Sequence, residues 1–430
     1  MTHFAAALFS LLLLAIPAAN VVAADLADEV ESGEIFTKET SELFNRERYS
    51  WVERDKVMRF PTPSFSLFGM KTGETIVEMK DGKVARVRAY LHNRGDDGAI
   101  SDDAFRTITQ GAIATLDGKF GAKRKQLDFK PDPTSSYLDV SGLCWDSANA
   151  RILLEYALKG QQTGRLVPAS DYLRLTIYPA GAEIPSDITM RQRAANTDIK
   201  RNATALGTAG RVITNIPMVD QGNKGYCAAA AVARILNYYG YDRLDQHQIA
   251  LWAKSDAQDG TSNDAMMRGI RRVLQDRYKL VVREFDEIDG QAVMKILEKY
   301  NEVAKKEGRP PIILPRGVVI DISTLWSMFA PVLLKKARAS STSQNDFWMR
   351  RIKEHIDKGI PVIWSVVLGC VKEEGLPQAV GGHMRLIIGY DDGNIIYSDT
   401  WGAGHERKTM PLADAISITT GLKVVSPRIN

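Results

Sequence analysis

The sequence has few of the residues that hold metals, cofactors or nucleic acids. Its 430 residues include only three cysteines and six histidines. These form neither a paired-histidine helix motif nor a two-cysteine knuckle, and no glycine-rich phosphate loop precedes a predicted helix. The 56 basic and 52 acidic residues leave a net charge of only +4. We therefore expect no metal, no cofactor and no nucleic acid partner.

Long apolar runs are also scarce, and the one that stands out is at the N-terminus. It spans residues 4–16, and Pro17 and the small-residue segment Val21-Val22-Ala23 follow. This layout predicts a secretory signal peptide at residues 1–24 and a secreted or periplasmic protein. Because the first three residues include no Lys or Arg, retention as an uncleaved anchor is the alternative. No later segment is long and apolar enough to span a bilayer, so no stable membrane insertion is expected after signal removal.

The overall composition is that of a soluble globular protein. Apolar residues make up 44% and charged residues 25% of the chain, and the length suffices for two or three domains. It indicates no particular oligomeric state. An odd number of cysteines in an exported protein indicates a free reactive thiol. Cys144 and Cys370 either form a disulfide or remain two buried thiols, and the sequence leaves both options open.

The first half of the chain predicts a small α+β domain at about residues 40–180. Alternating runs flank Lys80-Asp81-Gly82-Lys83, which is typical of a hairpin turn. Ser101 is a suitable cap for a helix that runs through Leu116, and further strand-like runs follow it. No motif in this domain indicates a chemistry. A polar segment at residues 181–210 is expected to link it to the rest of the chain.

Residues 211–425 predict a second α+β domain. Helical periodicity is present in six segments: 227–239, 245–254, 263–278, 291–306, 324–338 and 346–358. Strand-like runs follow at 361–368, 383–390, 394–398 and near Lys408. Helices first and an antiparallel sheet afterwards suggest a helical lobe and a β lobe with a ligand cleft between them.

The most informative motif in this domain is Gln221-Gly222-Asn223-Lys224-Gly225-Tyr226-Cys227. It places a lone cysteine at the start of a predicted helix that continues with four alanines. Unpaired backbone N–H groups at a helix N-terminus stabilise a thiolate, which is the nucleophilic form of cysteine. Cys227 is therefore a candidate nucleophile, and Gln221 is a candidate oxyanion donor.

Two further residues complete a candidate catalytic set. His383 follows Gly381-Gly382 and opens a buried-type strand, which suits a rigidly held base. Asp399 begins a turn after the next strand, and antiparallel pairing would bring it back beside His383 to orient the imidazole. Taken alone, each residue also has a structural interpretation: Cys227 as a small core residue, His383 as a hydrogen-bonded structural histidine and Asp399 as a turn former. Their consistent order and spacing favour a catalytic triad.

These segments resemble the papain-like cysteine peptidases, and more closely the bacterial double-glycine-peptidase-like relatives of bacteriocin-processing peptidases. The resemblance rests on residues 216–222 with Tyr226-Cys227, on residues 382–391 and on residues 397–402. It implies a papain-like two-lobed fold and hydrolysis of a peptide or protein substrate. It also implies that Cys227 is the nucleophile, His383 the base, Asp399 its orienter and Gln221 the oxyanion donor.

The sequence departs from this pattern in two ways. The cysteine and tryptophan that follow the nucleophile in papain are replaced by alanines, and no transporter accompanies the domain. A transglutaminase-like or amidase-type acyl transferase with the same triad, and an inactive peptide-binding module of the same fold, remain alternatives. The N-terminal domain could inhibit the cleft, bind substrate or tether the enzyme.

Overall fold

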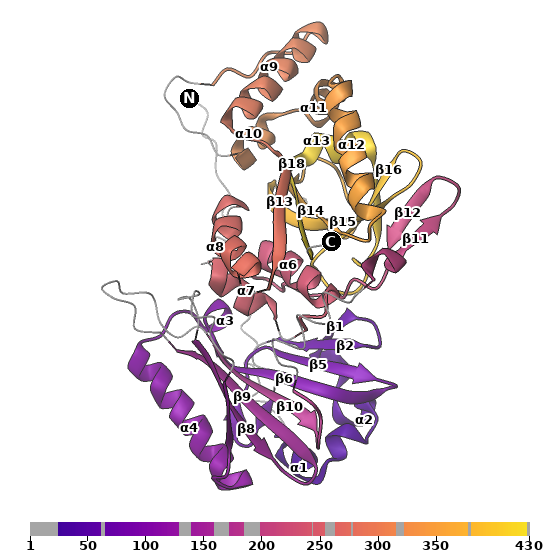
Figure 1. The fold of residues 1–430 in the computed structure, drawn as a ribbon. Coiled ribbons are helices and arrows are strands. Elements are labelled where there is room, and N and C mark those ends of the chain that lie inside the picture. Colours follow the sequence, from indigo (N-terminus) through magenta and orange to yellow (C-terminus); the bar gives the residue numbers. More distant parts are fainter. Residues whose placement is uncertain are drawn as a thin grey trace, which may run out of the picture.

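The computed structural model describes residues 25–61, 65–128, 139–158, 172–184, 198–242, 244–253, 263–276, 278–314, 322–376 and 380–427. The predicted signal peptide lies outside these residues. Within them, we find no helix that combines the length and the apolar character needed to span a membrane. The chain forms two large antiparallel sheets, one in the N-terminal part (residues 25–184) and one in the C-terminal part (residues 198–427), as Figure 1 shows.

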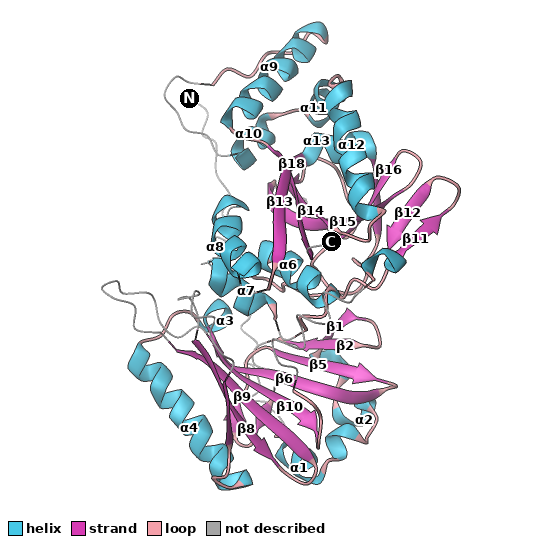
Figure 2. Cartoon of the chain, viewed as in Figure 1, coloured by secondary structure: helices cyan, strands magenta, loops and turns pink. Residues whose placement is uncertain are grey.

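The N-terminal part is built on an eight-stranded sheet (Figure 2). In sheet order its strands are β1 (Ser50–Glu53), β2 (Val57–Phe60), β5 (Thr75–Lys80), β6 (Lys83–Asn93), β10 (Tyr172–Pro179), β9 (Ala150–Leu158), β8 (Asp139–Asp146) and β7 (Lys125–Asp128). Strands β3 (Ser66–Leu67) and β4 (Met70–Lys71) form a separate small hairpin.

Local sequence signals explain much of this part. Lys80 pairs with Lys83 across a turn in which Asp81 and Gly82 both have positive φ, so the predicted hairpin is confirmed. The Ser101 side chain accepts a hydrogen bond from the Ala104 N–H and caps α4 (Asp102–Phe120), as the sequence predicted. Short helices complete the part: α1 (Ala27–Ser32), η1 (Glu34–Phe36), α2 (Thr40–Leu43), η2 (Arg46–Arg48) and α3 (Arg94–Asp97).

The C-terminal part contains the second sheet. In order its strands are β11 (Ala203–Leu206), β12 (Gly210–Ile213), β15 (Gly381–Tyr390), β14 (Val362–Leu368), β18 (Thr419–Pro427) and β13 (Leu280–Glu287), and β16 (Asn394–Ser398) joins β15 to β17 (Lys408–Pro411). β11 lies near the end of the segment that we expected to be a linker. β13 comes from the helical half of the sequence, which therefore supplies one edge of the sheet.

Helices and a short 3-10 turn surround this sheet. They are η3 (Ile199–Asn202), α6 (Cys227–Tyr238), α7 (Gln246–Ala253), α8 (Asn263–Asp276), α9 (Gly290–Lys306), α10 (Ile322–Met328), α11 (Pro331–Ala339), α12 (Thr342–Ile356) and α13 (Leu412–Ile418). The single helix predicted over 324–338 is wrong. Pro331 begins a new helix there, because its ring cannot continue the preceding helical turn.

Each sheet has its own apolar core. The core of the N-terminal part extends from Leu26 to Ile177, and that of the C-terminal part from Ile199 to Val425. The mixed class with antiparallel sheets is thus as predicted. All three cysteines are free, so Cys144 and Cys370 form no disulfide. Buried ion pairs, rather than a shared apolar core, connect the two parts, and α7 lies at their boundary (Figure 1).

Candidate active site

Cys227 is the first residue of α6, at the place that the sequence predicted. No side chain caps this helix, so the backbone N–H groups of its first turn are available to a negative charge at the sulfur. Ala228 to Ala231 are all buried and anchor the helix in the core. Cys227 itself is only partly buried, whereas Cys144 and Cys370 are 3% and 7% exposed. Cys227 is therefore the accessible thiol of the three.

His383 and Asp399 meet through the hairpin of β15 and β16. The register pairs Leu386 with Ser398, so that Asp399, the next residue, lies across from Arg385, and His383 is two residues farther along β15 on the same face. The His383 Nε2 atom is 2.6 Å from Asp399 Oδ1, and the Thr400 N–H donates to the same oxygen at 2.8 Å. The bond between His383 and Asp399 fixes the orientation of the imidazole and leaves its Nδ1 atom for a second partner. The antiparallel return predicted from the sequence is present.

The second partner of His383 is the thiol of Cys227, to which it is hydrogen-bonded. Burial raises the pKa of Cys227, but the hydrogen bond and charge of His383 outweigh it. The backbone N–H groups of Met384 and Ala228 add to the effect, so the thiol pKa lies below its ordinary value. The predicted sulfur, imidazole and carboxylate therefore form one continuous chain of contacts.

The electrostatics of this chain favour an imidazolium. Burial lowers the pKa of His383, but the Asp399 carboxylate and the Cys227 sulfur together raise it to about 9. Burial likewise opposes the ionised form of Asp399. The charge and hydrogen bond of His383, the charge of Arg385 and the Thr400 N–H nevertheless hold the Asp399 pKa well below its usual range. A thiol of lowered pKa beside a histidine of raised pKa, with a carboxylate behind them, is the arrangement that favours ionisation of a cysteine.

Arg385 is a component of the site that the sequence analysis missed. It is two residues after His383 on β15, on the same face of the strand, and it is completely buried. Its Nε atom is 3.2 Å from Asp399 Oδ2, and its Nη1 and Nη2 atoms donate to Glu373 at 2.8 and 3.0 Å. The guanidinium also lies over the Trp364 and Tyr397 rings. Arg385 thus balances the charge of Asp399.

Arg234 on α6 is a second missed component. It is 1% exposed and has no carboxylate in its hydrogen bonds. It donates to the Pro217 carbonyl at 2.9 Å, to the Asp399 carbonyl at 2.7 Å and to the Ser398 hydroxyl at 2.6 Å. Burial lowers its pKa to about 10. The helix that begins at Cys227 is therefore tied directly to the loop that carries Asp399.

Trp401 covers the histidine. Its ring stacks on the His383 ring, with centroids 4.3 Å apart and planes 1° apart. Stacking at this angle holds the imidazole in one plane and keeps water from one of its faces. The sequence analysis placed a turn at Asp399 but gave Trp401, two residues later, no role.

Gln221 lies in a tightly bonded loop next to the residues that follow Asp399. Its backbone N–H donates to the Thr400 carbonyl at 2.9 Å, and its Oε1 atom accepts from the Thr400 hydroxyl at 2.5 Å. Its Nε2 atom donates to the Lys224 carbonyl at 3.0 Å. Within the described residues, the second hydrogen of this amide has no partner. Gln221 is thus brought to the same region as the triad, with one donor unused.

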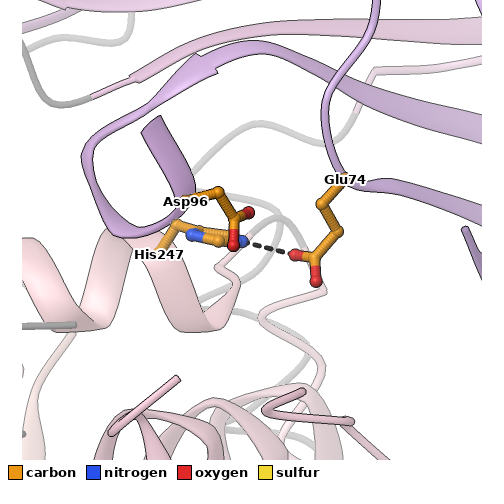
Figure 3. Close-up of side chains that lie close together, drawn as sticks. All are labelled: Glu74, Asp96 and His247. Atoms are coloured by element: carbon orange, nitrogen blue, oxygen red, sulfur yellow. Dashed lines mark hydrogen bonds and ion pairs between the residues drawn. The ribbon is translucent and has the colours of Figure 1, made fainter. Parts of the chain in front are cut away.

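Three side chains at the boundary of the two parts have the composition of a metal site. Glu74, Asp96 and His247 point toward one another, as Figure 3 shows, and each offers a ligand atom within 4.8 Å of the others. However, the Lys224 ammonium lies 3.0 Å from Glu74 and 2.9 Å from Asp96. Because a cation already neutralises both carboxylates, these residues fit an ion-pair network better than a metal centre.

Comparison with known proteins finds a family model that matches part of the chain. Residues 318–418 match the Peptidase_C39 like family. No curated protein matches the sequence. One similar solved structure is the peptidase domain of Streptococcus ComA, a bifunctional ABC transporter involved in a quorum sensing pathway. The sequences are 12% identical over 50% of this chain and 100% of that domain, with a TM-score of 0.26.

A second similar structure is that of a protein from Bacillus anthracis, described as a C39-like peptidase. It is 10% identical, the alignment covers 51% of this chain and 98% of that one, and the TM-score is 0.30. The family match includes His383 and Asp399 but begins after Gln221 and Cys227. The predicted resemblance is confirmed: over residues 318–418 this chain resembles the C39-like cysteine peptidases.

Proposed function

We propose that this protein is an exported cysteine peptidase that hydrolyses peptide bonds through an acyl-enzyme on Cys227. The observation that carries the proposal is the unbroken chain of contacts from the Cys227 sulfur through His383 to Asp399. The family match over residues 318–418 supports a peptide or protein as the substrate. The apolar N-terminal segment with its small-residue end supports export, with residues 1–24 removed.

Acylation uses the ion pair directly. The Cys227 thiolate attacks the carbonyl carbon of the peptide bond, and the carbonyl oxygen becomes an oxyanion. The Cys227 backbone N–H and the unused Nε2 hydrogen of Gln221 are the donors for that oxygen. The His383 imidazolium then gives its proton to the leaving nitrogen, the C–N bond breaks, and an amine departs. The product on the enzyme is a thioester.

Deacylation reverses the roles of the same groups. Neutral His383 takes a proton from water, and the resulting hydroxide attacks the thioester carbon. The carbon–sulfur bond breaks, the Cys227 thiolate leaves, and the carboxylic acid is released. Asp399 stabilises the imidazolium at both stages, and Arg385 keeps Asp399 ionised.

The test is cleavage of casein, followed by mass spectrometry of new N-termini. We expect cleavage by the mature protein and none by Cys227→Ala, whose fold is checked by circular dichroism. Adding a primary amine such as dansylcadaverine to the same assay distinguishes peptide hydrolysis from acyl transfer. Amine incorporation without cleavage would indicate a transglutaminase-like enzyme. No reaction of either kind would indicate an inactive peptide-binding module.

A further inference from the structure

The N-terminal part of the chain contacts two loops of the site: the loop that carries Gln221, called the Gln221 loop, and the loop that carries Asp399, called the Asp399 loop. We propose that it is a positioning element of the active site, which holds the oxyanion residue Gln221 through Lys224. This proposal rests on the proposed function and assigns the N-terminal part a role in it. Lys224 touches no reacting atom in this scheme, so it is a positioning residue and not a catalytic one.

Lys224 connects the two parts by its two ends. Its side chain is 6% exposed and crosses the boundary, where it donates to Glu74 at 3.0 Å and to Asp96 at 2.9 Å. Both acceptors come from the N-terminal part, as Figure 3 shows. Its backbone carbonyl accepts the hydrogen bond from Gln221 Nε2. The ion pairs that hold the Lys224 ammonium therefore also restrict the Lys224 backbone carbonyl, which orients the Gln221 amide.

The rest of the Gln221 loop is held by the same region. Arg59 of β2 donates to Glu74 at 2.5 Å and lies 3.7 Å from Asp220. Gly222 has φ +64° and lies so close to the Arg59 guanidinium that a Cβ there would collide with it. This glycine therefore lets the loop approach the N-terminal sheet closely.

Two further contacts reach the residues that flank the catalytic groups. A Cβ at Gly95 in α3 would collide with the Tyr226 ring, so α3 lies directly against the residue before Cys227. The Trp51 carbonyl of β1 accepts a hydrogen bond at 3.0 Å from the Ala403 N–H, in the loop that follows Asp399. The N-terminal part thus supports the Gln221 loop and the Asp399 loop together.

One of the roles that the sequence left open is inhibition, in which the N-terminal part would cover the nucleophile. Among the residues that the structure describes, no hydrogen bond or ion pair joins the N-terminal part to Cys227 or His383. Its contacts go to the neighbouring loops instead. Support of those loops is therefore the role that the contacts favour.

Lys224→Met in the full-length mature protein tests the proposal. Iodoacetamide reports the Cys227 thiolate, which Lys224 does not touch, so we expect its alkylation rate to stay within about twofold of wild type. Hydrolysis of p-nitrophenyl acetate depends on the oxyanion donors, and we expect its kcat to fall about 100-fold because the Gln221 amide is misplaced. Lys224→Arg should recover part of this loss.

The matched control is Asp245→Asn. Asp245 also forms a buried ion pair across the boundary, with Arg174 at 2.5 Å, and it has no contact with the Gln221 loop. We expect a similar loss of thermal stability but an unchanged kcat, measured below the melting temperature of both variants. Equal losses of kcat in the two variants would overturn the proposal, because support of the fold would then explain both.

Hydrogen–deuterium exchange gives a readout that needs no turnover. We expect faster exchange of residues 219–226 in Lys224→Met than in Asp245→Asn. Unchanged exchange in that segment would overturn the positioning role. If residues 219–226 exchange faster in Lys224→Met but the wild-type protein hydrolyses neither casein nor the ester, the proposed function is overturned and the positioning role is retained. The two failures are therefore distinguishable.

Discussion

The Nε atom of Arg385 lies 3.2 Å from Oδ2 of Asp399, while Oδ1 of the same carboxylate contacts His383 Nε2 at 2.6 Å. The carboxylate therefore stands between two cations in a region closed to solvent, since both Arg385 and Asp399 are completely buried. Glu373 compensates the far side of the guanidinium. The triad is thus extended beyond Asp399 by alternating charges on Arg385 and Glu373.

Replacing Arg385 by Met should lower kcat and shift the pH profile of the reaction. Without the guanidinium, the pKa of Asp399 rises, because one of the causes that lowers it is gone. The acid limb of the kcat/KM profile should move to higher pH, and kcat should fall about 100-fold as the imidazole loses its fixed orientation. The measurement is a pH series of ester hydrolysis.

The control for this prediction is Arg86→Met, which breaks a pair with Glu78 at 2.6 Å in the sheet of the N-terminal part, whereas the triad belongs to the C-terminal part. Arg385→Met removes one partner of a fully buried pair, which costs about 3–5 kcal/mol of stability, whereas the Arg86–Glu78 pair is only partly buried and its loss costs less. Arg86→Met should nevertheless keep the wild-type acid limb. An unshifted limb in Arg385→Met would refute the role given to the arginine.

Arg234 should be a determinant of stability as well as of geometry. Arg234→Met leaves three acceptors without their donor: the buried Asp399 carbonyl and Ser398 hydroxyl, and the partly buried Pro217 carbonyl. An unsatisfied buried polar group costs about 1–3 kcal/mol, so the two buried acceptors predict a loss of about 2 kcal/mol or more in urea unfolding. Arg234→Lys cannot reach all three acceptors and should fall in between. A change below about 1 kcal/mol would contradict the tie between α6 and the Asp399 loop.

His383 should make stability depend on pH in a defined direction. Its pKa rises from an ordinary 6.5 to about 9 in the fold, so the folded state favours the protonated ring. This contribution is present in full below pH 6.5, declines as the pH rises above it, and is lost once the pH passes about 9. Urea midpoints of wild type and His383→Gln, measured from pH 6 to pH 10, should therefore converge as the pH increases. Parallel curves would show that the ring is not charged in the fold.

The sequence predicts the parts of this site that depend on order and local spacing. Cys227 begins a helix because small residues follow a glycine-rich loop, and Asp399 returns to His383 because Asp391-Asp392-Gly393-Asn394 forms a hairpin. Both inferences need only local chemistry. The same holds for the Ser101 cap of α4.

The missed residues are those whose partners are distant in the sequence. Arg234 and Arg385 each interrupt an apolar run, and a charge in such a run is the signal that could have indicated them. Their acceptors, however, are contributed by other loops. The same limit applies to Lys224, whose partners Glu74 and Asp96 lie in the other part of the chain, and to β13, which crosses from the helical half to pair with β18.

The most direct test of the central claim is the pH dependence of Cys227 alkylation by iodoacetamide, in wild type and in His383→Gln. Peptide mass spectrometry separates Cys227 from Cys144, whose pKa burial raises, and from Cys370, whose pKa burial raises to about 11. We predict that wild-type Cys227 reacts fast at pH 6, while the variant follows a simple thiol with a pKa of about 8.5. Superimposable profiles for the two proteins would contradict the thiolate–imidazolium pair on which the proposed peptidase depends.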